Sequence, residues 1–298
     1  MYKLKKWINI NNLNWEFLSA NENAIELLEN NMDKIDWGLL SLNPNAIPLL
    51  ENNMDKIDWG LLSLNPNAIH ILSKNNNKID WHALSRNPNA IPLLEENIDK
   101  INWFWLSENP NAIDLLSKNT DKINWNQLSV NPNAILLLEE NFDKINWDCL
   151  SSNPNAIHLL EENVDKIDWA FLCENENAIH ILEKNLNEAN WEILSTNPKA
   201  IYILERNLNK LDFEDWSALS KNPNAIHILE KNYHNIDWNN ISYNLSIFEL
   251  DYEALEKRCN IYKEELMKNA LHPSVIAKYL NHPDLKDKDL DYILENCF

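Results

Sequence analysis

The sequence predicts an all-α fold, an α-solenoid of about eleven 22-residue repeats, each built from two short helices. Tryptophan recurs every 22 residues from Trp15 to Trp191 and returns, after an insertion of three residues, at Trp216 and Trp238. Asparagine stands six residues after each of these tryptophans, from Asn21 to Asn244. Aliphatic residues inside the unit are spaced to cover one arc of a helix. A period this constant is typical of a repeat array rather than of a single globular core.

With tryptophan as position 0, the unit reads W-x-x-L-S-x-N-P-N-A-I-x-L-L-E-x-N-x-D-K-I-D, and residues 147–168 are a nearly ideal copy. The aspartate or asparagine before each tryptophan, such as Asp36, caps a first helix through its side-chain oxygen. This helix stops before the Asn-Pro pair, because proline disfavours the α conformation in the preceding residue. We therefore expect a first helix of one or two turns, in α or 3₁₀ form.

The asparagine at position 6 is predicted to cap a second helix that begins at the proline of position 7. Positions 9, 10, 12 and 13 form its buried face, and position 11 points most directly away from the core. Asparagine fills position 16 in every full-length copy, from Asn31 to Asn232. In a chain with only two glycines, we expect it to end the second helix in the left-handed conformation. The isoleucine at position 20 is predicted to be buried between repeats.

No single unit can bury its own apolar residues, so neighbouring units must stack. A fully buried tryptophan would contribute roughly 4–6 kcal/mol at about 25 cal/mol per Å². Units about 10 Å apart would make a curved rod on the order of 100 Å long. Residues 1–14 are predicted to be an N-terminal cap, residues 15–250 the solenoid, and residues 251–298 a C-terminal helical cap. In that last cap, His272-Pro273 and His282-Pro283 resemble the start of a second helix.

The Asn-Pro-Asn element in a 22-residue unit resembles the leucine-rich repeat variant, whose units alternate α and 3₁₀ helices in a right-handed superhelix. The longer phrase L-S-x-N-P-N-A-I-x-L-L-E-x-N-x-D-K-I-D-W is similar to repeat proteins of large DNA viruses of protists (mimivirus-like). The C-terminal motifs beginning at Asp251, Tyr262 and Leu271 share this resemblance, which extends from about Trp15 to Asp291. It implies a viral origin and no particular activity.

A formal charge of −20 and a pI near 4.7 disfavour binding to nucleic acid and to anionic membranes. No apolar run is long enough for a signal peptide or a membrane span. The cysteines lack metal or disulfide spacing and are predicted to be free thiols in a reducing compartment. They are Cys149, Cys173, Cys259 and Cys297. We expect a cytoplasmic protein, in the host cytoplasm if the chain is viral, with the virion as the alternative.

Histidine occupies the outward position 11 in four repeats, where equivalent residues would lie about 10 Å apart, too far to share one metal ion. Glutamate recurs at position 14 as a ladder, at Glu139, Glu161, Glu183, Glu205 and Glu230. Catalysis needs one differentiated constellation, whereas a repeat offers many identical ones. We therefore predict no catalytic residue, no metal and no cofactor, and a chain that is not an enzyme.

Positions 1, 2, 5, 11 and 15 vary between copies on a constant framework. Such variation is expected where a repeat surface is adapted to one ligand or where it is simply unconstrained. Because the array is rigid and has no catalytic constellation, we predict a protein–protein interaction scaffold with a protein partner, and a host protein is a candidate. The residues predicted to bind the partner are His158, His180, Tyr202, His227, His70 and Asp114. The alternatives are a structural or virion-assembly component and an acidic mimic of nucleic acid. The sequence leaves open whether position 11 lies on the concave or the convex face.

Overall fold

The computed structural model describes residues 2–270, 272, 274, 275 and 277. The chain divides into two compact units, one of Leu4–Glu249 and one of Met1–Lys3 with Leu250–Phe298. In the second unit, α22 spans Tyr252–Ala270. The motif predicted at His282-Pro283, together with Leu271, Pro273 and Cys297, lies outside the described residues. The predicted boundaries of the two caps stay predictions.

The first unit is a stack of short helix pairs, which confirms the predicted all-α solenoid. The first helices are α1 (Trp15–Ala20), α3 (Trp37–Leu42), α5 (Trp59–Leu64), α7 (Trp81–Arg86), α9 (Trp103–Glu108), α11 (Trp125–Val130), α13 (Trp147–Ser151), α15 (Trp169–Glu174), α17 (Trp191–Thr196), α19 (Phe213–Lys221) and α21 (Trp238–Ile241). The second helices are α2 (Ile25–Glu29), α4 (Ile47–Glu51), α6 (Ile69–Ser73), α8 (Ile91–Glu95), α10 (Ile113–Ser117), α12 (Ile135–Glu139), α14 (Ile157–Glu162), α16 (Ile179–Leu182), α18 (Ile201–Arg206) and α20 (Ile226–Lys231). Each pair belongs to one repeat.

Short 3₁₀ helices connect the pairs. Those near the end of a repeat are η1 (Ile10–Asn12), η2 (Met32–Lys34), η4 (Asn76–Lys78), η5 (Ile98–Lys100), η6 (Thr120–Lys122), η7 (Phe142–Lys144), η8 (Val164–Lys166), η9 (Glu183–Asn185), η10 (Leu208–Lys210) and η12 (Tyr233–Asn235). Those at the Asn-Pro turn are η3 (Pro44–Ala46), η11 (Pro223–Ala225) and η13 (Leu245–Ile247). Two short strands, β1 (Tyr2–Leu4) and β2 (Phe248–Leu250), pair with each other.

The first helices begin and end where the sequence predicts. The carboxylate of Asp36 accepts a hydrogen bond from the backbone N–H of Leu39 at 2.7 Å and so caps α3. The same cap opens each of the other first helices, with aspartate or asparagine as the acceptor. Each supplies a partner to an N–H group that the helix itself leaves free.

The second helices begin three residues later than predicted. Pro44 to Ala46 form a 3₁₀ turn, and the α-helix starts at Ile47. The amide oxygen of Asn43 accepts from the backbone N–H of Asn45 at 3.0 Å, and the carbonyl of Asn43 accepts from Ala46 N at 3.1 Å. These two bonds close a tight turn before the wider α-helix can begin.

The prediction of a left-handed asparagine at position 16 is wrong. Asn31 has φ −142° and ψ 50°, and no non-glycine residue in the described part of the chain has a positive φ. Its side-chain amide donates instead to the carbonyl of Leu27 at 2.9 Å, four residues back. The equivalent asparagines make the same bond, including Asn53, Asn97 and Asn141. The helix therefore ends by side-chain hydrogen bonding to a free carbonyl rather than by reversing the backbone twist.

Two buried polar ladders run through the stack, an asparagine ladder that joins neighbouring repeats and a serine ladder that joins the first helix of a repeat to the residue that ends it. The amide of Asn43 donates to the carbonyls of Ser19 and Asn21 at 3.1 and 3.0 Å. The hydroxyl of Ser41 donates to the carbonyl of Trp37 at 2.7 Å and accepts from the backbone N–H of Asp58 at 3.1 Å. These side chains are buried, and so are the leucine at position 3, the alanine at position 9 and, in most repeats, the isoleucine at position 20. The core thus runs continuously through the stack.

The tryptophans of position 0 are half-buried, contrary to the expectation of full burial, with Trp216 as the buried exception. In most repeats, the lysine of position 19 lies over the indole ring, as Lys166 does over Trp147 at 4.3 Å from the centroid. The equivalent pairs are Lys34–Trp15, Lys56–Trp37, Lys78–Trp59, Lys100–Trp81, Lys122–Trp103, Lys144–Trp125 and Lys210–Trp191. The framework lysine therefore completes the cover of the tryptophan by a cation–π contact.

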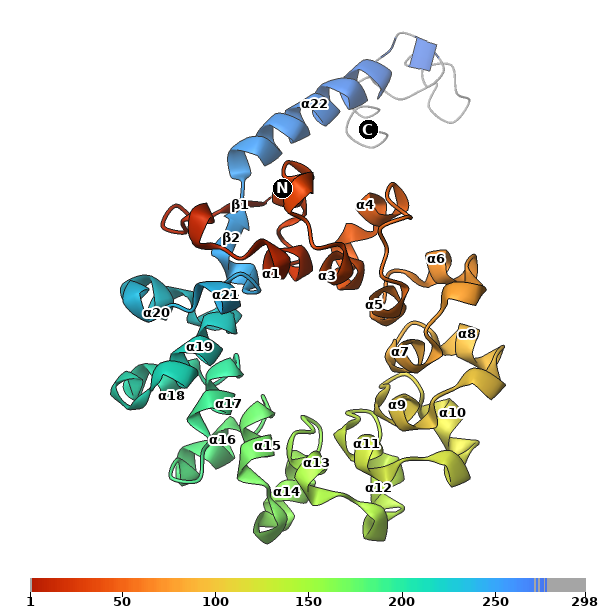
Figure 1. Cartoon of the computed structure of the whole chain (residues 1–298), viewed down its shortest axis with the longest axis vertical. Coiled ribbons are helices and arrows are strands. Elements are labelled where there is room, and N and C mark those ends of the chain that lie inside the picture. The colour runs from red at the N-terminus through yellow and green to blue at the C-terminus, as the bar shows by residue number, and fades with distance from the viewer. Residues whose placement is uncertain (1, 271, 273, 276, 278–298) are drawn as a thin grey trace, which may run out of the picture. The chain divides into compact units, whose positions relative to one another are not determined.

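The repeats close into a ring, so the expectation of an open curved rod is wrong (Figure 1). The amide of Asn21 in the first repeat donates to the carbonyls of Ser242 and Asn244 in the last, at 3.0 and 3.2 Å. These are the bonds that Asn43 makes to the first repeat. Phe17 also stacks on Tyr243 with the ring centroids 4.5 Å apart. The first and last repeats thus meet as internal neighbours do.

The eleventh repeat is composed of two separate segments of the chain. Trp238 begins it, but the chain turns into β2 at Phe248 instead of forming a second helix. The missing end of this repeat comes from residues 9–14, where η1 precedes Trp15 by the same interval as η2 precedes Trp37. Leu13 is buried like the isoleucines of position 20, and Asn14 N donates to the Ser242 hydroxyl at 2.9 Å. This composite repeat closes the ring without a covalent bond.

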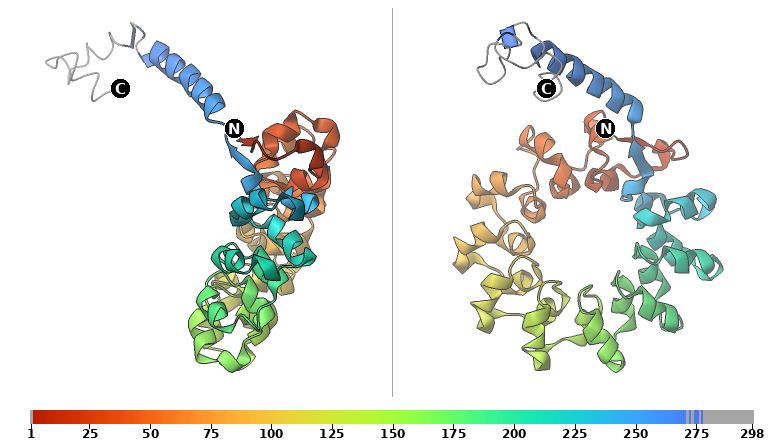
Figure 2. Two further views of the ribbon diagram at one scale, coloured as in Figure 1. Left: turned by 90° about the vertical axis from the view of Figure 1, so that its left-hand side faces the viewer. Right: turned by 180° about the vertical axis from the view of Figure 1, so that it is seen from behind.

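The first helices form the inner row of the ring, and the second helices form the outer row (Figure 1). The view from behind shows the same two rows (Figure 2). Position 11 of the second helices therefore lies on the convex side, which the sequence left open.

Candidate interaction surfaces

The outer row carries the residues predicted to bind a partner. His158, His180, Tyr202 and His227 lie on four successive second helices, α14, α16, α18 and α20, so the structure brings them into one continuous series. His70 on α6 and Asp114 on α10 occupy the same position of the unit in other repeats. All six side chains are exposed. They form one series of four along the row, with His70 and Asp114 each on a separate repeat outside it.

Each outer-row histidine is paired with the glutamate at position 14 of the preceding repeat. The distance from histidine Nε2 to glutamate Oε1 is 2.9 Å for His158–Glu139 and His180–Glu161. His70–Glu51 and His227–Glu205 make the same contact, at 2.9 and 2.7 Å. The residues at positions 11 and 14, which are two separate rows in the sequence, therefore form one surface on which histidines and glutamates are paired.

Tyr202 continues this pairing with Glu183. Burial, followed by the hydrogen bond and the charge of Glu183, raises the pKa of Tyr202 to about 12. A phenol that keeps its proton donates to the carboxylate, as the histidine ring can in the neighbouring repeats. Within the described residues, no cluster of three or more histidine, cysteine or acidic side chains could hold a metal ion.

The inner row presents apolar and acidic side chains from positions 1, 2 and 5. Phe104 and Phe171 are exposed there, at 42% and 41%. The Arg86 guanidinium stacks on the Trp105 ring at 4.6 Å and forms an ion pair with Glu108 at 3.2 Å. This row varies as much between repeats as the outer row does, so it is a second candidate surface.

Framework residues are replaced mainly between residues 173 and 215. Cys173 stands where other repeats have the ladder serine, and Glu176 stands where most have proline. Glu188 replaces the lysine that covers tryptophan, and Lys199 replaces the asparagine of position 8. Cys173 is a free thiol and is buried, which raises the pKa of the thiol. We call residues 169–237 the irregular arc and residues 37–168 the regular arc.

The three-residue insertion adds a turn to one helix of the inner row. Helix α19 has nine residues, and a capping box joins Asp212 to Asp215 at its start. Asp215 is buried, and burial raises the pKa of its carboxyl, to which the charge of Glu192 also contributes. Asp215 N donates to the Asp212 carboxylate, whereas the equivalent N–H groups of other repeats, such as Asp237 N, donate to the ladder serine. Ser195 Oγ is accordingly the one buried side-chain polar atom in the described residues without a hydrogen-bond partner.

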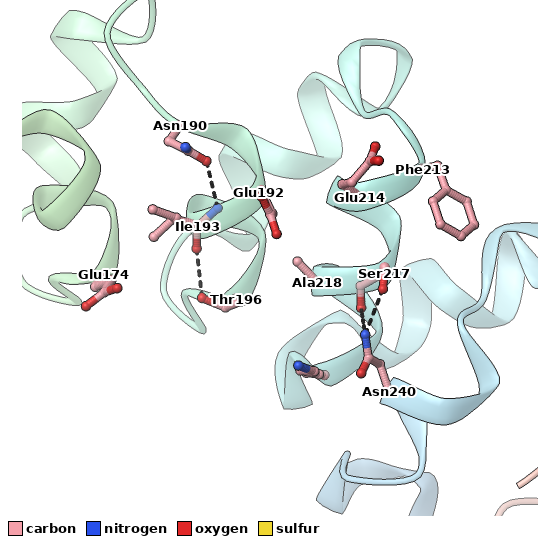
Figure 3. Close-up of a pocket in the computed structure, with 11 residues that line it drawn as sticks. Glu174, Asn190, Glu192, Ile193, Thr196, Phe213, Glu214, Ser217, Ala218 and Asn240 are labelled. Atoms are coloured by element: carbon pink, nitrogen blue, oxygen red, sulfur yellow. Dashed lines mark hydrogen bonds between the residues drawn. The ribbon is translucent and has the colours of Figure 1, made fainter. Parts of the chain in front are cut away.

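A hollow of about 350 Å³ lies among α15, α17, α19 and α21, next to this added turn (Figure 3). Its apolar wall is Ile193, Ala218 and Phe213, whose side chain is 77% exposed. Its charged residues are Glu174, Glu192, Glu214 and Lys221. Among the residues that the structure describes, none of the three glutamate carboxylates takes part in an ion pair or a hydrogen bond.

The floor of the hollow is held by hydrogen bonds between neighbouring repeats. The amide of Asn240 donates to the hydroxyl and carbonyl of Ser217 at 2.7 and 3.1 Å (Figure 3). The Ser217 hydroxyl donates to the Asp237 carboxylate at 2.6 Å. A second hollow of about 620 Å³, lined by Leu211, Trp216 and His234 among others, shares Phe213 as a wall. Phe213 thus stands between two concave surfaces.

None of the residues predicted from the sequence to bind a partner lies in this hollow. The spacing of 25 residues between Trp191 and Trp216 was the visible indication, because the other repeats keep 22.

Comparison of the chain with protein-family models, with curated proteins and with solved structures finds no match. Among the described residues, no helix is both long enough and apolar enough to cross a membrane.

Proposed function

We propose that the chain is a non-enzymatic protein–protein interaction scaffold, in which a closed ring of repeats presents varied side chains to a protein partner. The observation that carries this proposal is that different positions of the unit serve stacking and surface exposure. Framework residues are used in bonds between repeats, as the amides of Asn43 and Asn21 illustrate. The positions that vary between copies are left on the inner and outer rows. A constant frame with a variable surface is the arrangement that repeat proteins use for recognition.

Ring closure supports a scaffold over a component that polymerises head to tail. An open stack leaves an unpaired repeat face at each end, through which copies could add. Here Asn21 of the first repeat is already bonded to the last repeat, and Asn14 completes that last repeat by its bond to Ser242. The lateral surfaces are then the ones available to a partner. With a charge of −20, a partner with a basic surface is favoured over nucleic acid.

The resemblance to repeat proteins of large DNA viruses supports a partner in the infected host, with the host cytoplasm or the virion as the place of action. The outer-row residues His158, His180, Tyr202 and His227 are the proposed contact. Their pairing with glutamates gives each repeat a donor and an acceptor side by side, at half-exposed positions.

The test is affinity purification of the tagged chain from the cells that express it, followed by mass spectrometry. One variant changes His158, His180, Tyr202 and His227 together to serine. The matched control is His82→Ser, because His82 is an exposed histidine on the inner-row helix α7. A partner that is lost in the fourfold variant and kept in the control supports the proposal. If the wild-type chain reproducibly recovers no protein, the scaffold proposal is wrong.

A further inference from the structure

The three-residue insertion at the start of α19 interrupts the constant framework of the ring next to a concave surface. Ten of its first helices have four to six residues, whereas α19 has nine. The added residues are Phe213, Glu214 and Asp215, and only Asp215 is buried. Phe213 and Glu214 are therefore exposed by an insertion that the stacking of the repeats does not require.

The interruption costs stability locally. It leaves the Ser195 hydroxyl buried without a partner and places the Asp215 carboxyl where burial raises its pKa. A buried hydroxyl without a hydrogen-bond partner loses its bonds to water and gains none in the fold, so it lowers the stability of the folded state. A chain that maintains ten other interfaces without this cost retains it here next to an exposed phenylalanine. Sites that depart from the best local structure are where function is expected.

We propose that the hollow between α17 and α19 docks a segment of a partner protein that combines lysine or arginine with an apolar side chain. The apolar side chain lies against Phe213, Ile193 and Ala218. The cationic groups lie between Glu174, Glu192 and Glu214, whose carboxylates form no ion pair with any residue that the structure describes.

The charge of the hollow indicates that the partner segment carries cationic side chains. Three carboxylates and one ammonium, that of Lys221, line the hollow, so its field attracts a cation. The charge of Glu192 already acts on Asp215, which places a negative potential at the helix interface. The exposed Phe213 ring can contact both an aliphatic side chain and a guanidinium face. A purely acidic or purely polar segment would satisfy neither feature.

The size of the hollow fits one or two side chains rather than a whole domain. Its volume of about 350 Å³ is at the lower end of the range for ligand pockets. The second hollow, of about 620 Å³, begins on the other side of Phe213. An extended segment crossing Phe213 would place successive side chains in both.

The experiment is fluorescence anisotropy of the full chain with a labelled peptide Gly-Arg-Leu-Arg-Arg-Leu-Gly. Two control peptides carry glutamate in place of arginine, or serine in place of leucine. We expect the first peptide to bind the wild-type chain more tightly than either control. The double variant Glu192→Gln with Glu214→Gln should bind it about tenfold more weakly, because two charge contacts are lost, and a tenfold change corresponds to about 1.4 kcal/mol. Phe213→Ser should also weaken binding.

The matched control variants change the same residue types at position 1 of other repeats. They are Glu16→Gln with Asp148→Asn, and Phe104→Ser, all on exposed side chains of the inner row. These should leave binding unchanged, and circular dichroism should show every variant folded. The proposal is overturned if both sets of variants weaken binding equally, if the wild-type chain does not prefer the first peptide, or if no peptide binds.

This inference deepens the proposed function and rests on it, but the two fail separately. If the peptide does not bind and affinity purification still recovers a partner, the scaffold stands and the hollow is not its docking site. If the peptide binds selectively while purification recovers no partner, the hollow recognises the stated chemistry and the proposed scaffold role falls.

Discussion

The regular arc and the irregular arc show what the same 22-residue unit does with and without its framework residues. In the regular arc, every ladder serine has both of its hydrogen bonds, as Ser151 does with Trp147 and Asp168. In the irregular arc, Cys173 replaces one serine, and Ser195 has no partner. The regular arc contains no insertion, and the irregular arc contains the one that forms the hollow. Stability is thus concentrated where the repeats are alike, and a unique surface appears where they differ.

The largest expected effect is the loss of a ladder asparagine in the regular arc. In Asn131→Ala, two donated bonds to the carbonyls of Ser107 and Asn109 disappear, together with the bond accepted from Asn133 N. At about 1 kcal/mol for each buried bond, we expect a loss of about 3 kcal/mol in the free energy of unfolding. Urea denaturation followed by tryptophan fluorescence measures it.

Asn21→Ala is the matched variant at the ring closure. Asn21 makes the same three bonds, with Ser242 and Asn244 as the acceptors in place of a preceding repeat and Asn23 N as the donor. A closed ring predicts a loss similar to that of Asn131→Ala. If the free energy of unfolding falls only by about 1 kcal/mol, the amount for one hydrogen bond, the first and last repeats are apart in solution and the ring is not closed.

The comparison of two serines is the next effect in size. Ser151→Ala removes the acceptor of the half-buried Asp168 N–H, and an N–H left without a partner there costs about 1–2 kcal/mol. Ser195→Ala removes a hydroxyl that has no partner, so we expect no loss, or a gain of up to about 1 kcal/mol. Urea midpoints of the two variants measured side by side test this. Equal losses would show that Ser195 is hydrogen-bonded in solution and that the irregular arc is not strained.

Local features of this fold could be predicted from the sequence, because each depends on a few neighbouring residues. The caps at Asp36 and Asn43 and the buried Ile57 follow from side-chain chemistry within one unit. The ending of the second helix could not be predicted, because Asn31 had a hydrogen bond to Leu27 available that competes with the left-handed conformation. The half-exposed Trp147 was missed because the covering Lys166 is a polar residue.

Ring closure and the hollow depend on the geometry of many units together. A small rotation per repeat, which no single residue sets, decides whether the first and last repeats meet. The segment that completes the eleventh repeat is visible in the sequence, because residues 9–14 end in Leu13-Asn14 as other repeats end in Ile-Asp or Ile-Asn. The pairing of His158 with Glu139 likewise required knowing which row of one repeat faces which row of the next. The predicted contact residues on the outer row stay predictions.

A smaller effect is expected from restoring a framework lysine in the irregular arc. Glu188 stands at the position from which Lys166 covers Trp147 in the preceding repeat, and Trp169 lacks such a lysine. Glu188→Lys should stabilise the chain by about 0.5 kcal/mol through a cation–π contact with Trp169. The reverse change in the regular arc, Lys166→Glu, should destabilise it by a similar amount. Thermal unfolding of both variants tests the pair, and a destabilising Glu188→Lys would show that the irregular arc has a different backbone path.

The smallest effect concerns Tyr202, whose pKa of about 12 lies above its ordinary value of 10.0. A raised folded-state pKa means that the contact stabilises the chain fully below pH 10 and that this contribution is lost as the pH rises from about 10 through about 12. The tyrosinate absorbance of the wild-type chain minus that of Tyr202→Phe should therefore appear near pH 12. Glu183→Gln should move this transition downwards while leaving it above the ordinary value, because burial is the larger cause and persists. A difference spectrum that titrates at the ordinary value in the wild-type chain would show that Tyr202 is not paired with Glu183, and that the outer row is discontinuous in the irregular arc.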